Sequence, residues 1–309
     1  MKTLTLIVPC YNESEVLPLL YKEVRAVAGG LAGFNVILLF VDDGSSDKTL
    51  EIIKNFTASD GNVKYVSFSR NFGKEAAMLA GMSYAGGDYV GIIDADLQHS
   101  PSMIPEMLEA VDEHGYDVAA AKRTDRAGES AVKGLLSGFF YKVMNSASDV
   151  YIDDNAQDFR IMRMNVVKAI LSLPERGRFS KGIFSWVGFK TKWFPHENRE
   201  RAAGTTKWSF KSLLKYAFEG ILSFTTSPLK LPTYFGGLSI FAGILSAAYG
   251  IMRGLTDPKF HPGHYIILAA VCGVGGLVLL MLGIIAAYLA KLFREIKARP
   301  MFIVAETNI

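Results

Sequence analysis

The sequence predicts an α/β protein with a mostly parallel sheet, followed by a hairpin of two membrane-spanning helices. Over residues 1–200, apolar runs of strand length alternate with helical patterns, and such alternation favours right-handed βαβ units. Further along, segments 231–252 and 265–290 contain no charged residue, and each exceeds the roughly 20 residues that a helix needs to cross a bilayer. We therefore expect a globular domain with an anchor on its C-terminal side.

The sheet elements follow from these apolar runs. Continuous apolar runs suit strands that are covered on both faces, and the expected strands are 4–9, 35–41, 63–68 and 89–94. The expected helices between them are 15–28, 47–58 and 73–85. Ligands of such sheets bind at the carboxyl ends of the strands. Polar clusters follow all four strands there: CYNE, DDGSSD, SRNFGKE and DADLQH.

Three domains are expected along the chain: a globular domain over 1–209, an amphipathic segment over 210–229, and a transmembrane hairpin with a C-terminal tail over 230–309. The amphipathic segment repeats apolar residues at the spacing of one helix face. It is expected to lie in the membrane interface, and the alternative is a helix packed on the globular core. Basic residues flank both predicted spans, so the globular domain and both termini are expected on the cytoplasmic side. Small residues in the second span favour close helix packing, and we expect a homo-oligomer formed through these helices.

The stretch DADLQ places two carboxylates beside each other. In an extended segment, Asp94, Asp96 and Gln98 would point to one side of the chain. Clustered carboxylates repel each other unless a cation or a proton lies between them. Oxygen ligands of this kind suit Mg²⁺ or Mn²⁺, which commonly complete their shell with substrate phosphates. The alternative is a solvated Asp-x-Asp turn that binds nothing.

Composition and missing motifs exclude several other classes. A net charge of +3 is too small to indicate nucleic-acid binding, and the two cysteines form no disulfide framework, which fits a reducing cytosol. No phosphate-binding P-loop and no G-x-S-x-G elbow occurs. His99 and His196 have no His/Cys cluster around them in the sequence and are expected to serve as hydrogen-bonding neighbours.

Several ordered motifs together resemble a known family. VPCYNES, VDDGSSDKT and DADLQHSP are similar to the nucleotide-sugar-binding half of family 2 glycosyltransferases of the Rossmann-like GT-A fold. SRNFGKEAAMLAG, AKRTDR, DFRIM, ERGRFSKGIFSWVGFKT and RAAGTTKW, with two C-terminal spans, resemble the bactoprenol (undecaprenyl-phosphate) glucosyltransferases, relatives of the dolichyl-phosphate mannose synthases. The resemblance covers essentially the whole chain.

The resemblance implies a donor site and a catalytic carboxylate. The nucleobase and ribose pocket corresponds to Pro9, Tyr11, Glu13, Asp42 and Asp43. The metal and diphosphate site corresponds to Asp94, Ala95, Asp96 and Gln98. Basic residues that close over the diphosphate correspond to Arg123, Arg201 and Lys207, together with Trp208. Asp158 takes the place of the catalytic carboxylate, with Gln157 where the family usually has glycine. Asp96, Arg201 and Lys207 are expected to join it in catalysis, since charge develops on the leaving diphosphate.

The implied acceptor is a lipid phosphate, which calls for cationic partners. The candidates are Arg126, Lys133, Arg176, Arg178 and Lys181. For each of them the alternative is a solvated surface charge.

The resemblance implies an inverting, metal-dependent transfer of a hexose, glucose from UDP-glucose, to undecaprenyl phosphate at the bacterial inner membrane. The product would serve in modification of cell-surface polysaccharide, an expectation that rests on analogy alone. Two alternatives stay open. The donor could be GDP-mannose, a UDP-N-acetylhexosamine or an aminopentose nucleotide, or the chain could be a non-catalytic membrane scaffold that keeps a nucleotide-binding domain.

Overall fold

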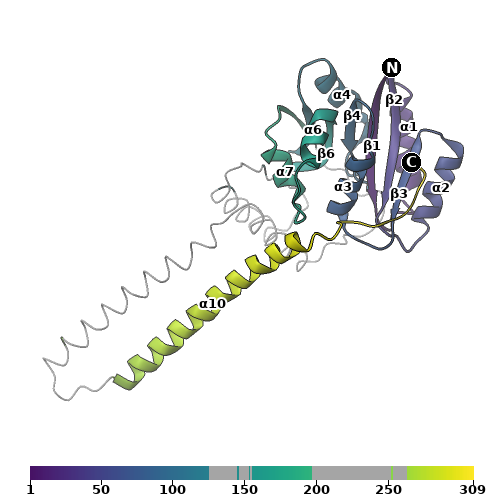
Figure 1. The fold of residues 1–309 in the computed structure, drawn as a ribbon. Helices are drawn as coiled ribbons and strands as arrows, with labels where there is room; N and C mark the ends of the chain where they lie inside the picture. The colour runs from purple at the N-terminus through teal and green to yellow at the C-terminus, as the bar shows by residue number, and fades with distance from the viewer. Residues whose placement is uncertain (125–144, 146–152, 154, 197–251, 253–262) are drawn as a thin grey trace. The chain divides into compact units, whose positions relative to one another are not determined.

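A computed structural model describes residues 1–124, 145, 153, 155–196, 252 and 263–309 of the chain. The chain divides into two compact units, one formed by Met1–Gly220 with Arg299–Ile309 and the other by Ile221–Ala298. The first unit is an α/β domain built on a single sheet (Figure 1). The α/β class and the mostly parallel core of the sheet, both predicted from the sequence, are confirmed.

The sheet has eight strands in the order β7-β5-β6-β4-β1-β2-β3-β8. Their bounds are β1 Lys2–Cys10, β2 Phe34–Asp42, β3 Val63–Phe68, β4 Tyr89–Ile92, β5 Val118–Arg123, β6 Ala156–Arg163, β7 Thr191–His196 and β8 Val304–Thr307. Strands β4, β1, β2 and β3 run parallel. Most of their residues are buried, as expected for strands that are covered on both faces. The carboxyl ends of these strands therefore meet at one edge of the sheet.

Helices cover both faces of this sheet (Figure 1). Their bounds are α1 Leu17–Ala28, α2 Thr49–Ser59, α3 Lys74–Tyr84, α4 Ile104–Asp112, α6 Met164–Leu171 and α7 Ser180–Trp186, with a short 3₁₀ turn, η1, at Pro101–Met103. The apolar faces of α1, α2 and α4 join one core cluster with alternate residues of the strands. Helix α3 packs on β1 and β2 and contacts α6. At the contact with β1 a glycine is required at position 81, because a Cβ there would come within 2.2 Å of the Ile7 side chain.

The four expected strands and three expected helices are present; β3 has the predicted bounds, and the ends of the others are shifted by one or two residues. The difference that bears on the site is at β4, which was predicted to continue through Asp94 and ends at Ile92. The chain turns after Ile93, and Leu97 has a left-handed backbone with φ of 56°. The DADLQ stretch is therefore a turn and not an extended segment.

The second half of the sheet was not predicted. Strand β6 lies antiparallel to β4 and separates it from β5, which runs parallel to β7. The run of alanines in β5 is fully buried. These connections place residues near 158 next to residues near 94.

The end of the chain adds the last strand. Strand β8 pairs antiparallel with β3 and covers what would otherwise be the sheet edge. The Asn308 side chain continues this pairing, because its Oδ1 accepts from the Tyr65 N–H at 2.7 Å and its amide donates to the Val63 carbonyl at 3.3 Å. Phe302 stacks on Phe68 with ring centroids 5.1 Å apart. The segment that was expected to be a simple tail is thus part of the globular unit.

In the second unit the structure describes mainly α10, Gly263–Lys297. The second predicted span falls within the bounds of this helix. The amphipathic segment 210–229 and nearly all of the first predicted span lie outside the described residues. Among the helices that the structure does describe, none combines the length and the hydropathy needed to cross a membrane. The transmembrane hairpin stays a prediction.

Replacing Asn308 with Ala tests the importance of β8. The change removes two hydrogen bonds to the backbone of β3, each worth about 0.5–1.5 kcal/mol, so we expect the free energy of unfolding to fall by roughly 1–2 kcal/mol. Urea unfolding of the full chain measures it. Asn55→Ala, at an exposed position of α2, is the matched control, and equal stability of the two variants would contradict the assigned role.

Candidate active site

The loops after β1 and β2 are joined by hydrogen bonds at the carboxyl edge of the sheet. Asn12 has a left-handed backbone with φ of 54°, and its side chain accepts from the Ser46 N–H at 2.8 Å. Its own N–H donates to Ser45 Oγ at 2.9 Å. The next residue, Glu13, donates its N–H to Thr49 Oγ1 at 2.8 Å. The CYNE and DDGSSD motifs therefore form one surface.

Asp42 and Asp43 lie beneath this surface with their oxygens engaged. Both are buried. Asp42 accepts from Ser67 Oγ at 2.8 Å and from the Ser45 N–H at 3.1 Å. Asp43 accepts from two successive backbone N–H groups, those of Phe72 and Gly73, at 2.6 and 2.9 Å. Burial raises the pKa of Asp43, while these N–H donors oppose the change. Their predicted role in nucleoside binding stays a prediction, as it does for Pro9, the 37% exposed Tyr11, and Glu13.

Two glycines set the loop that precedes α3. Gly44 has φ of +65°, and a Cβ there would come within 2.4 Å of the Arg70 carbonyl carbon. Gly73 has φ of +98° and directly precedes the first residue of α3. Together with Asp43, these glycines fix where α3 begins. The position of Lys74 therefore depends on the loop after β2.

The DADLQH turn alternates between buried and partly exposed residues. Ala95, Leu97 and His99 are buried, whereas Asp94, Asp96 and Gln98 are partly exposed. The turn is closed by the Gln98 N–H, which donates to Asp96 Oδ1 at 3.2 Å. The predicted grouping of the three polar side chains agrees with this pattern of burial, although the backbone is a turn.

His99 anchors the turn to the neighbouring strands. Its ring stacks on Phe159 with centroids 5.5 Å apart, and its Nδ1 lies 2.8 Å from Nε2 of His196 at the end of β7. Burial lowers the pKa of His99 to about 4 and also lowers the pKa of His196, so both rings are neutral near pH 7. The expectation that these histidines are hydrogen-bonding neighbours is confirmed.

The pairing of β4 with β6 brings Asp158 to the turn. Ile92 pairs with Arg160 in the antiparallel register. Continuing that register by two residues sets Asp94 opposite Asp158. Arg160 holds the Asp158 segment in place, because its guanidinium donates to the Gln157 carbonyl at 2.8 Å and lies 3.5 Å from the centre of the Phe184 ring. Gln157 does not have a positive φ, so the position does not require glycine.

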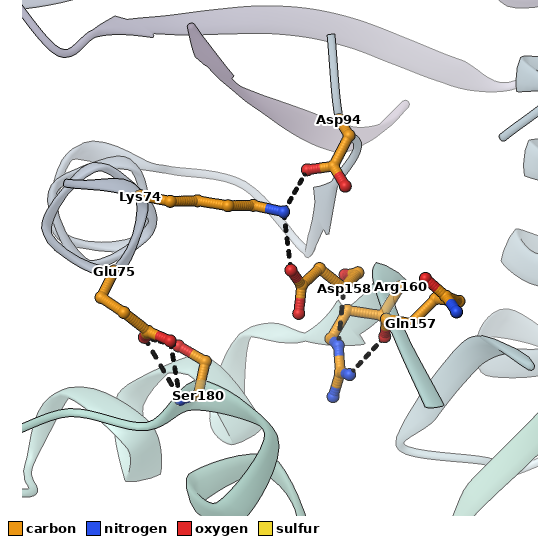
Figure 2. A network of polar contacts seen from close by, with 7 residues as sticks. All are labelled: Lys74, Glu75, Asp94, Gln157, Asp158, Arg160 and Ser180. Carbon is orange, nitrogen blue, oxygen red and sulfur yellow. Dashed lines mark hydrogen bonds and ion pairs between the residues drawn. The ribbon is translucent and has the colours of Figure 1, made fainter. Parts of the chain in front are cut away.

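Lys74 lies between the two carboxylates (Figure 2). Its Nζ is 2.6 Å from Asp94 Oδ1 and 2.7 Å from Asp158 Oδ2. Burial acts to lower the pKa of Lys74, but the two carboxylates outweigh it and raise that pKa above its ordinary value. Burial acts to raise the pKa of Asp158, and the charges of Lys74 and Lys181 bring it well below the usual range. Both groups are therefore charged at neutral pH.

The next residue of α3 is fixed from the other side. The Glu75 carboxylate accepts from the backbone N–H of Ser180 at 3.2 Å and also from its hydroxyl group (Figure 2). Burial raises the pKa of Glu75, while the Ser180 hydroxyl opposes the change. The first turn of α3 is thus held by the loop after β2 and by the start of α7.

The predicted cations fall into two groups. Arg126, Lys133, Arg201, Lys207 and Trp208 lie outside the described residues. Arg123 is at the end of β5, beside His196. Arg178 donates to the Leu173 and Ile170 carbonyls, and Arg176 Nε donates to the Arg299 carbonyl at 2.9 Å. Of the described acceptor candidates, Lys181 is the one whose charge acts on Asp158.

The donor atoms at the turn suit a hard cation. Among the described residues, no group of three or more His, Cys, Asp or Glu side chains is arranged to hold a metal ion. Asp94 and Asp96 nevertheless offer carboxylate oxygens, and Mg²⁺ is commonly held by one or two carboxylates plus substrate phosphates and water. Their chemistry therefore fits a divalent cation that is shared with a diphosphate.

Sequence reasoning missed Lys74, Glu75 and Ser180. SRNFGKE was recognised as a polar cluster at a strand end, but none of its side chains was given a role. A signal was present, because a lysine at the start of a helix beside several strand-end aspartates is a natural counter-charge.

Comparisons with known proteins identify relatives of this chain. Residues 5–171 match the model of the family described as "Glycosyl transferase family 2". The SfII prophage-derived bactoprenol glucosyl transferase of Shigella flexneri is 38% identical over 305 residues, covering 99% of this chain and 98% of that protein. The prophage bactoprenol glucosyl transferase homolog of Escherichia coli is also 38% identical, over 301 residues, covering 97% of this chain and 98% of that protein.

Among solved structures, the chain resembles glucosyl-3-phosphoglycerate synthase from Mycobacterium tuberculosis in complex with Mn²⁺, UDP-glucose and phosphoglyceric acid. The identity is 17% and the TM-score 0.48, over 72% of this chain and 78% of that one.

Gly44→Ala tests the loop that places Lys74. The added Cβ would require both a left-handed backbone and a shift of residues 70 and 71, so we expect a loss of roughly 2 kcal/mol or more in unfolding free energy. Gly61→Ala is the matched control, because no atom lies within 4 Å of a Cβ at that position. Chemical denaturation of both variants measures the change in unfolding free energy. Equal losses in the two variants would show that the close approach of Gly44 to the Arg70 backbone is unimportant.

Glu75→Gln and Glu75→Ala test the contact with Ser180. Because the pKa of Glu75 is raised in the folded state, wild-type stability falls as pH rises from the ordinary glutamate value through the raised one. The Gln variant lacks this loss, so we expect it to match or exceed wild type in unfolding free energy at pH 7, with the difference shrinking toward pH 4.5. The Ala variant leaves the Ser180 donors unpaired and should lose about 1–3 kcal/mol. Denaturation at both pH values measures these effects, and a Gln variant as unstable as the Ala variant would contradict them.

Proposed function

Because the chain belongs to glycosyl transferase family 2, we propose that this glycosyltransferase moves glucose from UDP-glucose to undecaprenyl phosphate, with inversion at the sugar. The observation that carries the proposal is the meeting of Asp158 with Asp94 of DADLQ, through Lys74, at the carboxyl edge of the sheet. Relatives over the whole chain bear the name bactoprenol glucosyl transferase, and this name supports a polyprenyl-phosphate acceptor.

The chemistry at the donor side is the departure of a nucleoside diphosphate. Negative charge grows on that group in the transition state, and cations placed there in advance stabilise it. Asp94 and Asp96 are the residues that would hold Mg²⁺ or Mn²⁺, which would supply such charge. Lys74 provides a further positive charge beside Asp94. Arg123, Arg201 and Lys207 are proposed to add theirs from the basic segments.

Asp158 is proposed to orient groups and not to remove a proton. Its pKa is brought below the usual range by Lys74 and Lys181, against the effect of burial, and a carboxylate of low pKa is a weak base at neutral pH. The proposed nucleophile needs little help, because the second pKa of a phosphate monoester is about 6 and the group is largely ionised. A carboxylate between two lysines can instead fix their positions around an incoming phosphate.

The acceptor phosphate is proposed to bind on the Lys181 side of Asp158. Lys181 is the second residue of α7 and is partly exposed. Arg176 and Arg178 already donate to carbonyl groups, so we propose that they contribute less than Lys181 to binding the acceptor phosphate. Arg126 and Lys133 stay candidates for the same phosphate.

Membrane attachment belongs to the proposal as well. Its support is in the sequence: two uncharged runs with basic residues on their flanks predict a hairpin with the catalytic domain on the cytoplasmic side of a bacterial inner membrane. A long-chain lipid phosphate is held in a bilayer, so an anchored enzyme would act where its acceptor is concentrated. Contact between hairpins would give the expected homo-oligomer.

The experiment that tests the function offers labelled nucleotide sugars to membranes that contain the full chain and undecaprenyl phosphate. UDP-glucose should yield a labelled, acid-labile lipid, whereas GDP-mannose, UDP-N-acetylhexosamine and an aminopentose nucleotide should yield little. Label from another donor would redirect the donor assignment. No labelled lipid from any donor would favour the non-catalytic scaffold.

Asp96→Asn tests the diphosphate site within the same assay. The variant keeps the size of the side chain and removes its charge, so we expect transfer to fall at least about a hundredfold with stability unchanged. Glu113→Gln, exposed at the end of α4, removes the same charge elsewhere and should leave transfer intact. Wild-type transfer by Asp96→Asn, or wild-type transfer in excess EDTA, would remove the metal from the proposal.

A further inference from the structure

The contact of Lys74 with Asp94 and Asp158 joins three separate elements at one nitrogen atom. Lys74 begins α3, Asp94 follows β4, and Asp158 belongs to β6. Both distances, 2.6 and 2.7 Å, are those of charge-assisted hydrogen bonds. The lysine side chain is 35% exposed, so solutes can reach it, whereas the Asp158 side chain is 18% exposed.

One ammonium group thus neutralises charge that would otherwise drive the two aspartates apart. Two carboxylates at such short range from a common point cannot both stay ionised without a cation between them. Lys74 supplies this cation from within the chain. Asp94 is also one of the two residues proposed to hold a divalent ion, so Lys74 and the metal would compete for the same carboxylate.

The reach of Lys74 is fixed by the protein around it. Asp43 accepts from the N–H groups of Phe72 and Gly73 immediately before it. Glu75, immediately after it, accepts from Ser180. The helix start is thus held on both sides. Because the backbone on both sides of Lys74 is held by hydrogen bonds, its ammonium group is directed at the two carboxylates.

We infer that Lys74 is a positioning residue of the transfer reaction, which holds Asp158 beside the donor site and competes with the divalent cation for Asp94. The inference rests on the proposed transfer reaction. When a divalent ion binds Asp94, the Lys74–Asp94 contact weakens and the ammonium remains on Asp158. Lys74 therefore keeps the acceptor-side carboxylate in place in both states, and it makes metal binding without donor weaker than the carboxylates alone would allow.

Lys74→Met in the full chain tests both parts. The variant keeps the length of the side chain and removes its charge. Transfer at saturating substrates should fall at least tenfold because Asp158 loses its partner. Binding of Mn²⁺ alone, followed by the electron paramagnetic resonance signal of free Mn²⁺, should become roughly tenfold tighter, since a unit charge within a few ångströms of the ion has been removed. Damage to the fold would weaken both sugar transfer and Mn²⁺ binding. Weaker transfer together with tighter Mn²⁺ binding therefore distinguishes the inference from a purely structural role.

Two further variants complete the experiment. Lys22→Met, on the exposed face of α1, removes the same net charge and should change neither quantity. Lys74→Gln serves if the Met variant does not fold, because its amide can still donate to one carboxylate; it should show the same two changes at smaller size.

Mn²⁺ binding by the Lys74 variants that equals or is weaker than wild type would overturn the inference, as would unchanged transfer. The inference and the proposed function fail separately. If the wild-type chain transfers no sugar, the proposed function fails, while the Mn²⁺ comparison still decides the competition for Asp94.

Discussion

Electrostatic repulsion at one edge of the sheet is the constraint on which the rest of the site depends. The parallel strands end together there. Asp42 and Asp43 lie at the end of β2, Asp94 follows β4, and Asp158 belongs to β6, which pairs with β4. Clustered carboxylates are tolerated only when each finds a hydrogen-bond donor or a counter-charge. The fold must therefore supply donors at each position. The kind of partner that offsets each negative charge distinguishes the aspartates with a structural role from those available for the reaction.

Asp42 and Asp43 are compensated permanently, because their donors are the hydroxyl group of Ser67 and backbone N–H groups. Backbone donors cannot leave, so these two carboxylates set the shape of the loops. Asp94 and Asp158 share a single lysine that is partly exposed. A side chain of this kind can change partners when a cation or a phosphate arrives. The exchangeable pair is therefore where we locate the chemistry.

The sequence was sufficient for the parallel half of the fold, because continuous apolar runs and strand-end polar clusters carry a local signal. Through the family resemblance it also pointed to Asp94, Asp96 and Asp158 as individual residues, whose roles stay predictions. The meeting of Asp94 with Asp158 could not be predicted, because it depends on the antiparallel register of β4 and β6, which joins segments more than sixty residues apart. The left-handed backbone of Leu97 could not be predicted either, since an apolar residue rarely adopts it. Lys74 was missed because its partners come from two other elements.

The C-terminal strand extends this reasoning to the support of the site. Residues 299–303 contact two segments that bear on Lys74 and the acceptor side: the Ile303 carbonyl accepts from the Ser69 N–H at 3.0 Å, and the Arg299 carbonyl accepts from Arg176. Ser69 starts the loop that ends at Gly73, and the ring of Phe72 in this loop lies edge-on to Phe68, which in turn stacks on Phe302. The last residues of the chain thus reinforce the loop that aims Lys74.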